Sequence, residues 1–165
     1  MRKLILIGRS EAGKSSLIGA IRARLGSPDT PYAGKTQAVD ASGPIIDTPG
    51  EYAEDRYLGG ALAIFSYEAD VVGLLLSATE PYSLFSPCCA AMETRPVIGI
   101  VTQCDRRCAN PKQAAEWLRL AGCEQIFFTS ARTGEGIGEL LDYLAANRTE
   151  IPDESSENKQ NSTFS

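Results

Sequence analysis

Apolar and polar residues alternate along the chain in two ways, as short apolar runs and as longer stretches with apolar residues at helical spacing. The short runs are typical of the buried strands of a parallel sheet, and they cover 4–7, 44–46, 70–76, 96–101 and 125–129. Apolar residues three or four positions apart predict helices over 16–25, 53–67, 110–120 and 136–146. The alternation of the two patterns predicts an α/β fold: an open, mostly parallel sheet with helices on both faces.

Two segments fall outside this alternation. Residues 80–95 carry Pro81, Pro87 and the pair Cys88-Cys89, so they are predicted to form a loop or a short helix. Residues 150–165 consist mainly of Ser, Asn, Glu, Lys and Gln with almost no apolar side chains, and we expect a disordered acidic tail there. Residues 1–149 are therefore expected to form one folded domain, long enough to bury a hydrophobic core.

Composition excludes several classes of protein. The formal net charge of −5 argues against a general nucleic-acid surface. The chain has no histidine, which excludes Ser-His-Asp and Cys-His catalysis. No apolar run approaches the length of a membrane span, and the run that begins after Lys3 is too short for a secretory signal. The five cysteines are then expected to be reduced thiols of a cytoplasmic protein.

The first apolar run leads into the pattern G-x-x-x-x-G-K-S over 8–15, a Walker A phosphate-binding loop. Its glycines leave backbone N–H groups open to phosphate, Lys14 is expected to reach the β- and γ-phosphates, and the Ser15 hydroxyl is expected to bind Mg²⁺. A glycine-rich turn that binds nothing is the alternative, but the strand before the motif and the helix after it favour the phosphate loop. The nucleotide-binding residues expected here are Gly8, Arg9, Ser10, Glu11, Ala12, Gly13, Lys14, Ser15 and Ser16.

The second apolar run ends in D-T-P-G, residues 47–50. In combination with a Walker A loop this pattern predicts that Asp47 supports Mg²⁺ through water and that the Gly50 N–H senses the γ-phosphate. The next residue is Glu51, where Ras-type proteins carry a water-positioning glutamine. Glu51 could act as a base, point away, or slow the turnover, and the sequence leaves these three open.

Thr36 lies between the two motifs, in the segment K-T-Q-A-V. In nucleoside-triphosphate switches a threonine in this region closes over Mg²⁺ and the γ-phosphate. Thr36 is our candidate for that residue, and the alternative is that it only begins an edge strand.

The order of the motifs, from G-x-x-x-x-G-K-S through D-T-P-G to T-Q-C-D and S-A-R, resembles the small Ras-like P-loop GTPases. Three further segments narrow the resemblance to the ethanolamine-utilisation P and propanediol-utilisation V family: 35–39, 46–52 and 95–102. Two others, 83–87 and 127–131, favour its propanediol branch. The resemblance implies a bacterial protein that accompanies shell-enclosed microcompartments, so a shell protein is a candidate partner.

The resemblance also implies a base-binding site. In Ras-like proteins the element N/T-K-x-D recognises guanine, its aspartate accepting two hydrogen bonds from the base. Here Thr102 and Asp105 fit that element, but Gln103 replaces the lysine that lies along the ring. Asp105 as a helix cap or turn residue is the alternative. From the S-A-R element, Ser130, Ala131 and Arg132 are expected at the base, the Ala131 N–H meeting guanine O6.

These residues lead to three hypotheses on function. The first is a slow Mg²⁺-dependent switch that binds GTP in preference to ATP, with Lys14, Thr36, Gly50 and Glu51 as candidate catalytic residues. The second is an ATP-dependent phosphotransferase of the acetate-kinase type, an activity attributed to the ethanolamine branch. The third is a module that docks on a microcompartment shell or another partner, with nucleotide as the regulator.

Two features have less specific interpretations. Cys104 lies beside the expected base site in sequence, so its alkylation could inhibit binding, while the cysteine spacing argues against a zinc site. The apolar segment 82–85 and the tail are candidate contact surfaces, although a packed loop and a solvated tail are the simpler interpretations.

Overall fold

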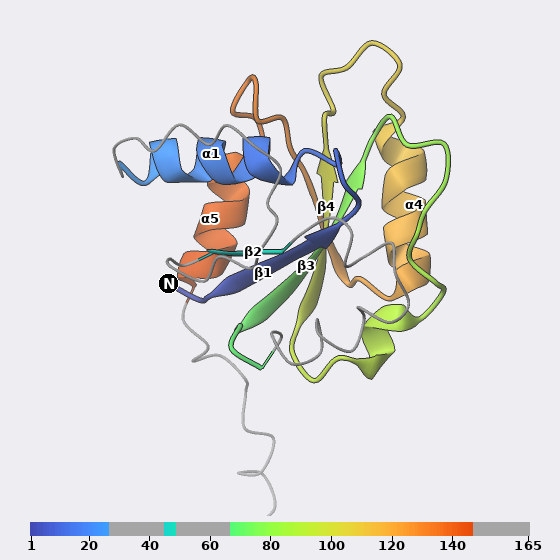
Figure 1. Cartoon of the computed structure of the whole chain (residues 1–165), viewed down its shortest axis with the longest axis horizontal. Coiled ribbons are helices and arrows are strands. Elements are labelled where there is room, and N and C mark those ends of the chain that lie inside the picture. The colour runs from blue at the N-terminus through green and yellow to red at the C-terminus, as the bar shows by residue number, and fades with distance from the viewer. Residues whose placement is uncertain (27–44, 49–66, 147–165) are drawn as a thin grey trace, which may run out of the picture.

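The structure, a computed structural model, describes residues 1–26, 45–48 and 67–146. The predicted alternation of strands and helices is confirmed within these ranges (Figure 1). The strands are β1 (Leu4–Gly8), β2 (Ile45–Asp47), β3 (Val71–Ser77), β4 (Val97–Thr102) and β5 (Gln125–Phe128). The helices are α1 (Lys14–Arg24), α4 (Pro111–Ala121), α5 (Ile137–Ala145) and the 3-10 helix η1 (Cys89–Met92).

The five described strands form one sheet in the order β2-β1-β3-β4-β5, and every neighbouring pair is parallel. Its register aligns Gly8 with Leu75 and Ser77 with Thr102. Because all the strands run the same way, the loops that follow them gather at one edge of the sheet, as Figure 1 shows. The loops that carry the predicted motifs therefore lie along this carboxyl-terminal edge.

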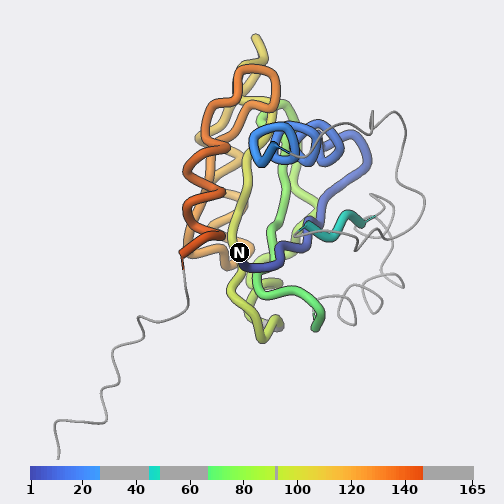
Figure 2. Tube along the Cα trace, turned by 90° about the vertical axis from the view of Figure 1, so that its left-hand side faces the viewer, coloured from blue at the N-terminus to red at the C-terminus, as the bar shows by residue number. Residues whose placement is uncertain are grey.

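Helices cover both faces of the sheet (Figures 1 and 2). Alternate residues of β1 point to opposite faces, as expected for a strand. Leu4 and Leu6 join a buried cluster with α1 and α5, while Ile5 and Ile7 join a second cluster with α4. The uninterrupted apolar runs of the sequence follow from this, because a strand buried on both faces has no solvent side.

The helix α4 shows how local sequence sets these boundaries. The Asn110 side chain caps the helix by accepting from the Gln113 N–H at 3.3 Å, and Pro111 follows at the first turn, where its missing N–H costs nothing. Gly122 ends the helix in the left-handed conformation. The predicted start at 110 or 111 is confirmed, and the helix ends at Ala121, one residue beyond the prediction.

The segment 80–95 is a loop with the single short helix η1, as predicted. Phe85 packs against the α4 cluster, which supports the packed-loop interpretation for that residue, whereas Tyr82 is 50% exposed. The predicted helix over 53–67 lies outside the described residues except for Tyr67, which is in a turn, and the predicted tail over 150–165 lies outside them entirely.

Candidate functional site

The phosphate loop, residues 8–15, joins β1 to α1 at the carboxyl-terminal edge of the sheet (Figure 1). Gly8 lies so close to β3 that a Cβ atom placed on it would be 2.8 Å from the Leu75 Cβ. The loop then turns through two left-handed residues, Glu11 with φ 69° and Gly13 with φ 87°. A backbone of this kind forms a concave nest of N–H groups, here directly before the positive end of α1.

The Lys14 side chain lies within this loop. Its Nζ donates to the Gly8 carbonyl oxygen at 2.6 Å, and the residue is 7% exposed. The next two residues on α1 carry hydroxyl groups, with Ser15 half-buried and Ser16 exposed. The first turn of α1 contains no acidic residue. The entry to the helix therefore presents an ammonium group, hydroxyls and N–H donors, the chemistry that binds phosphate.

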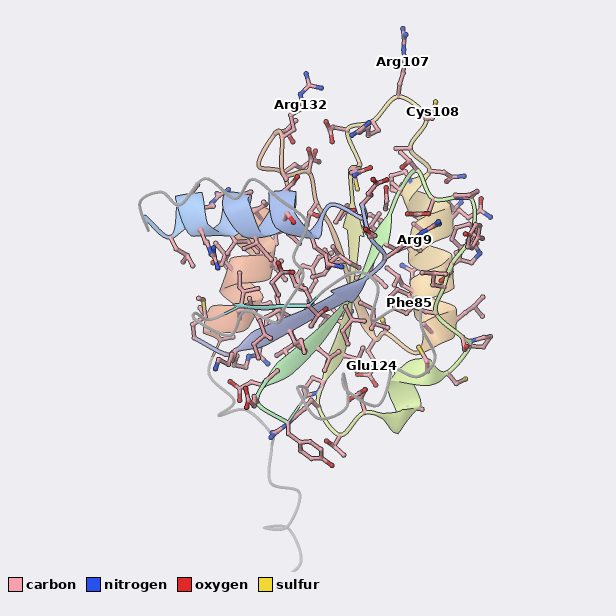
Figure 3. The ribbon with its side chains drawn as sticks, in the orientation of Figure 1. Arg9, Phe85, Arg107, Cys108, Glu124 and Arg132 are labelled. Atoms are coloured by element: carbon pink, nitrogen blue, oxygen red, sulfur yellow. The ribbon has the colours of Figure 1, made fainter. Side chains whose placement is uncertain are left out.

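Arg9 extends from the loop to the segment after β3 (Figure 3). Its Nη1 lies 3.4 Å from a Glu80 carboxylate oxygen and 3.0 Å from the Tyr82 hydroxyl. The guanidinium carbon is 5.3 Å from the centroid of the Tyr82 ring, a cation–π contact. Arg9 thus ties the phosphate loop to residues 80–82.

The strand β2 brings Asp47 beside the phosphate-loop strand. Asp47 pairs with Leu6 in the register of β1 and is 1% exposed. The next residue, Thr48, is anchored to β1, since its Oγ1 donates to the Leu6 carbonyl at 2.6 Å. The Asp47 carboxylate at the end of β2 and the Ser15 hydroxyl in the first turn of α1 are both hard oxygen donors, the donor type that fits Mg²⁺.

The loop after β4 is joined to the phosphate loop by a side chain. The buried Thr102 Oγ1 donates to the Ala12 carbonyl, a contact between residues 90 positions apart in sequence. Gly13 lies against the same place, because a Cβ atom on it would be 3.4 Å from both the Thr102 Oγ1 and the Gln103 Nε2. The phosphate loop and the loop after β4, which carry the two predicted parts of the site, are therefore in direct contact.

Asp105 lies further along this loop and is held by the S-A-R segment. Its Oδ1 accepts from the Ser130 Oγ at 2.8 Å, and its Oδ2 lies 3.9 Å from Nη1 of Arg132. The Asp105 side chain is 20% exposed and that of Arg132 is 87% exposed, so the carboxylate is mostly buried and the guanidinium reaches into solvent (Figure 3). Asp105 lies in a turn, but it is not a helix cap, since Asn110 caps α4.

One cavity of about 530 Å³ lies between the phosphate loop and the loop that follows β4, a size typical of small-molecule sites. It is lined by residues from α1, the two loops and the end of β5: Gly13, Ser16, Leu17, Ala20, Thr102, Gln103, Asp105, Arg106, Thr129, Ala131 and Arg132. Gly13, Ser16, Thr102, Gln103, Asp105, Ala131 and Arg132 were predicted from sequence, and the structure brings them together.

The structure adds residues that the motifs did not indicate. Leu17 and Ala20 of α1 add apolar side chains to the cavity lining, and Arg106 and Thr129 also line it. Ser77 contacts Gln103 from the end of β3, where its Oγ donates to the Gln103 Oε1 at 2.9 Å. The position of Ser77 at the carboxyl end of a buried strand was the signal in the sequence that could have found it.

Cys104 does not line the cavity. Its side chain packs against the cluster around α4, its Sγ lies 3.6 Å from the Val101 carbonyl oxygen, and burial raises the pKa of its thiol. The Cys104 side chain therefore packs with the α4 cluster rather than in the cavity, and inhibition of nucleotide binding by its alkylation stays a prediction. Among the described residues there is no group of three or more side chains that could hold a metal through His, Cys, Asp or Glu.

Three predicted residues, Thr36, Gly50 and Glu51, lie outside the described residues. Within the described ranges, no helix combines the length and apolarity that crossing a membrane requires.

Comparison with known proteins places these observations in a family. The family model described as ethanolamine utilisation – propanediol utilisation (PduV-EutP) matches residues 1–146. The propanediol utilization protein PduV of Citrobacter freundii is 41% identical over 149 residues, an alignment covering 88% of this chain and 95% of that protein. The tRNA modification GTPase MnmE of Rhizobium meliloti (strain 1021) is 32% identical over 164 residues, covering 92% of this chain and 34% of that longer protein.

The resemblance seen in the motifs is thus confirmed over residues 1–146. The phosphate loop at the start of a parallel α/β sheet is that of a Ras-like P-loop NTPase, in agreement with the similarity to a GTPase. The chain belongs to the ethanolamine-utilisation and propanediol-utilisation family, PduV-EutP.

Proposed function

We propose that this protein binds a nucleoside triphosphate with Mg²⁺, prefers GTP to ATP, and acts as a slow hydrolytic switch in propanediol utilisation. One observation carries the proposal: a single cavity has the phosphate loop at one end and the Asp105 carboxylate, oriented by Ser130, at the other. The link to propanediol utilisation comes from the family and from the relative in Citrobacter freundii.

At the phosphate end, Lys14 leaves its contact with the Gly8 carbonyl and binds the β- and γ-phosphates. Ser15, and Asp47 through water, would hold Mg²⁺, with Thr36 as a third candidate, and the Gly50 N–H would sense the γ-phosphate. When bound, the metal would supply positive charge against the transferred phosphoryl group.

At the base end, Asp105 accepts hydrogen bonds from the two N–H donors on the edge of guanine. Adenine does not offer that pair of donors, and a mostly buried carboxylate left without them loses free energy. Ala131 and Arg132 line the same cavity as this carboxylate, and we assign the Ala131 backbone N–H and the Arg132 side chain to the base.

Hydrolysis by the protein alone is expected to be slow, on the order of 10⁻³ s⁻¹ or less. Arg9 is the arginine within the phosphate loop, so it is the first candidate for a positive charge on the transferred phosphate. Its guanidinium instead contacts Glu80 and Tyr82. An arginine held in this way does not supply the charge that accelerates phosphoryl transfer. Fast turnover by the purified protein would contradict this expectation.

The first test is the binding of GTP and ATP, each with Mg²⁺, to the wild type and to Asp105→Ala. We expect a GTP preference of at least about tenfold, equivalent to about 1.4 kcal/mol, and its loss in the variant. Equal binding of ATP, unchanged by Asp105→Ala, would overturn the preference for guanine. Production of acetyl phosphate from acetate and ATP would then favour the phosphotransferase hypothesis.

Asp105→Asn gives a second test, in which the variant is expected to gain affinity for a different nucleotide. A misfolded variant would not show such a gain. The amide NH₂ opposes the 2-amino donor of guanine but matches the 2-oxo acceptor of xanthine. We expect GTP binding to fall and xanthosine triphosphate binding to rise by about tenfold or more. A variant that gains no affinity for xanthosine triphosphate would remove Asp105 from the base site.

A role in docking on a microcompartment shell is tested separately, by measuring shell association of the wild type and of Lys14→Ala. Loss of association in a folded variant would link docking to nucleotide, and unchanged association would separate the two.

A further inference from the structure

The middle of the phosphate loop is a turn with a strained backbone. Glu11 has φ 69°, in the left-handed region that residues other than glycine adopt rarely. The Ala12 N–H donates to the Arg9 carbonyl oxygen at 3.1 Å, which closes the turn around Ser10 and Glu11. A strained turn persists only where the surrounding structure holds it, so the contacts at its two ends determine whether the loop is formed before phosphate arrives.

Side chains tie both ends of this turn to other parts of the molecule. At its second end, the Thr102 Oγ1 donates to the Ala12 carbonyl. At its first end, Nη1 of Arg9 lies 3.4 Å from a Glu80 carboxylate oxygen and 3.0 Å from the Tyr82 hydroxyl, and the guanidinium also contacts the Tyr82 ring. The Glu80 side chain is 14% exposed, so its carboxylate is mostly shielded from solvent.

The segment that carries Glu80 is itself held in place by backbone hydrogen bonds. The Ala78 N–H donates to the Thr102 carbonyl at 2.9 Å, and the Ala78 carbonyl accepts from the Asn110 N–H at 2.7 Å. The Glu80 N–H donates to the Ser77 carbonyl at 3.1 Å, in the turn that follows β3 directly. These bonds fix Glu80 relative to the ends of β3 and β4 and the start of α4.

We propose that Glu80 and Tyr82 are positioning residues for the phosphate loop: by holding the Arg9 side chain, they keep the turn around Glu11 in the form that binds phosphate. This inference rests on the proposed function, because it requires a phosphate group in the loop. A loop already held in its binding form loses less conformational entropy when phosphate binds. Neither Glu80 nor Tyr82 belongs to a nucleotide-binding motif of the sequence, and both act through Arg9.

The test is the affinity of Glu80→Gln for GTP, ATP and inorganic triphosphate, each with Mg²⁺, measured by titration calorimetry. The substitution keeps the size of the side chain and removes a negative charge, which by Coulomb interaction alone would raise the affinity for an anion. The positioning role predicts the opposite sign, because a neutral amide holds the Arg9 guanidinium less strongly than a carboxylate does. We expect the affinity for all three ligands to fall by the same factor, about threefold to tenfold.

Two comparisons show whether the effect passes through Arg9. Glu124→Gln removes the same charge from an exposed residue just before β5, at the amino-terminal edge of the sheet, and should leave the three affinities unchanged. In an Arg9→Ala background, Glu80→Gln should no longer lower the affinity, because there is no guanidinium to hold. Tyr82→Ala should likewise lower the affinity in the wild-type background and not in the Arg9→Ala background. Thermal melting shows that each variant is folded.

Each outcome decides the inference. Lower triphosphate affinity in Glu80→Gln and Tyr82→Ala that disappears in the Arg9→Ala background supports it. Raised or unchanged affinity in either single variant, an equal loss in Glu124→Gln, or the same loss in both backgrounds overturns it. If the wild type binds neither a nucleoside triphosphate nor inorganic triphosphate, the proposed function fails instead, so the two failures are distinguishable.

Discussion

The two ends of the cavity are built in different ways. At the phosphate end, one contiguous stretch of chain supplies the loop, and the expected contacts come from backbone N–H groups and the buried Lys14. At the base end, side chains from two separate loops meet, as when the Ser130 hydroxyl donates to Asp105 across 25 positions of sequence. A binding site made of backbone N–H groups from one stretch of chain tolerates few substitutions. A site made of side chains from separate loops can be altered by substituting one side chain at a time.

The largest effect is expected from Lys14→Ala, which removes the ammonium group from the phosphate end. Loss of its charge-assisted hydrogen bonds should cost about 3 kcal/mol, on the order of 100-fold in affinity for GTP and ATP alike. Titration with both nucleotides measures this, and thermal melting shows whether the variant is folded.

Lys112→Ala is the matched control, since it removes the same charge from the exposed face of α4. A Lys14→Ala protein that melts like the wild type and still binds both nucleotides as tightly would show that the loop is not the phosphate site.

The next largest effect is expected where the two ends touch. Thr102→Val removes the hydroxyl that donates to the Ala12 carbonyl, and leaving that buried acceptor without its donor should cost about 1–3 kcal/mol of stability. Because the change displaces one end from the other, GTP and ATP should lose affinity by the same factor. Urea unfolding and nucleotide titration measure the two effects.

Thr102→Ser retains the hydroxyl and should restore most of the stability and affinity. A Thr102→Val protein that loses only the preference for GTP would instead place Thr102 at the base rather than at the junction.

A smaller effect, confined to the base end, is expected from Ser130→Ala. The Ser130 Oγ donates to Asp105 at 2.8 Å and accepts from the Thr133 N–H at 3.2 Å. Its loss frees the carboxylate to rotate, so the ratio of GTP to ATP affinity should fall by about threefold to tenfold, about 1 kcal/mol. Affinity for inorganic triphosphate should not change.

The exposed Ser86 provides the control, as Ser86→Ala removes a hydroxyl from a residue that does not line the cavity. If Ser130→Ala lowered the affinity for inorganic triphosphate as much as the affinity for GTP, the two ends of the cavity would not bind independently.

The smallest effect on binding is expected from thiol modification in the base-end loop. Burial raises the pKa of the Cys104 thiol, so its thiolate form is rare at neutral pH and gains population only as the pH rises toward that raised pKa. Iodoacetamide at pH 8 should label the exposed Cys108 before Cys104, as mass spectrometry of timed samples can show. Nucleotide affinity should stay unchanged after Cys108 is labelled.

Raised thiol pKa values also affect stability at high pH. Burial raises the pKa of the Cys123 thiol from its ordinary value of 9.0 to about 12. The folded state holds this proton more tightly than the unfolded state, so the stabilisation is fully present below pH 9 and is lost as the pH rises toward 12. Cys123→Ala should flatten this part of the stability profile relative to Cys108→Ala.

The sequence by itself determined the fold class, the strand and helix order and the phosphate loop. These depend on local patterns: apolar runs buried on both faces, the cap at Asn110, and glycines whose backbone angles the loop requires. Each pattern lies within a few residues, so the local sequence is enough to predict the feature that it causes.

Only the tertiary structure decided how the base end is arranged. Sequence indicated Asp105 and Gln103 but not that Ser130 orients the first and Ser77 the second, nor that Cys104 turns toward α4. A hydrogen bond fixes a side chain only when both partners are brought to within about 3 Å, and the parallel sheet does this by aligning the ends of strands that are distant in sequence. The residues that determine the phosphate end are neighbours in the chain, and those that determine the base end become neighbours only on folding.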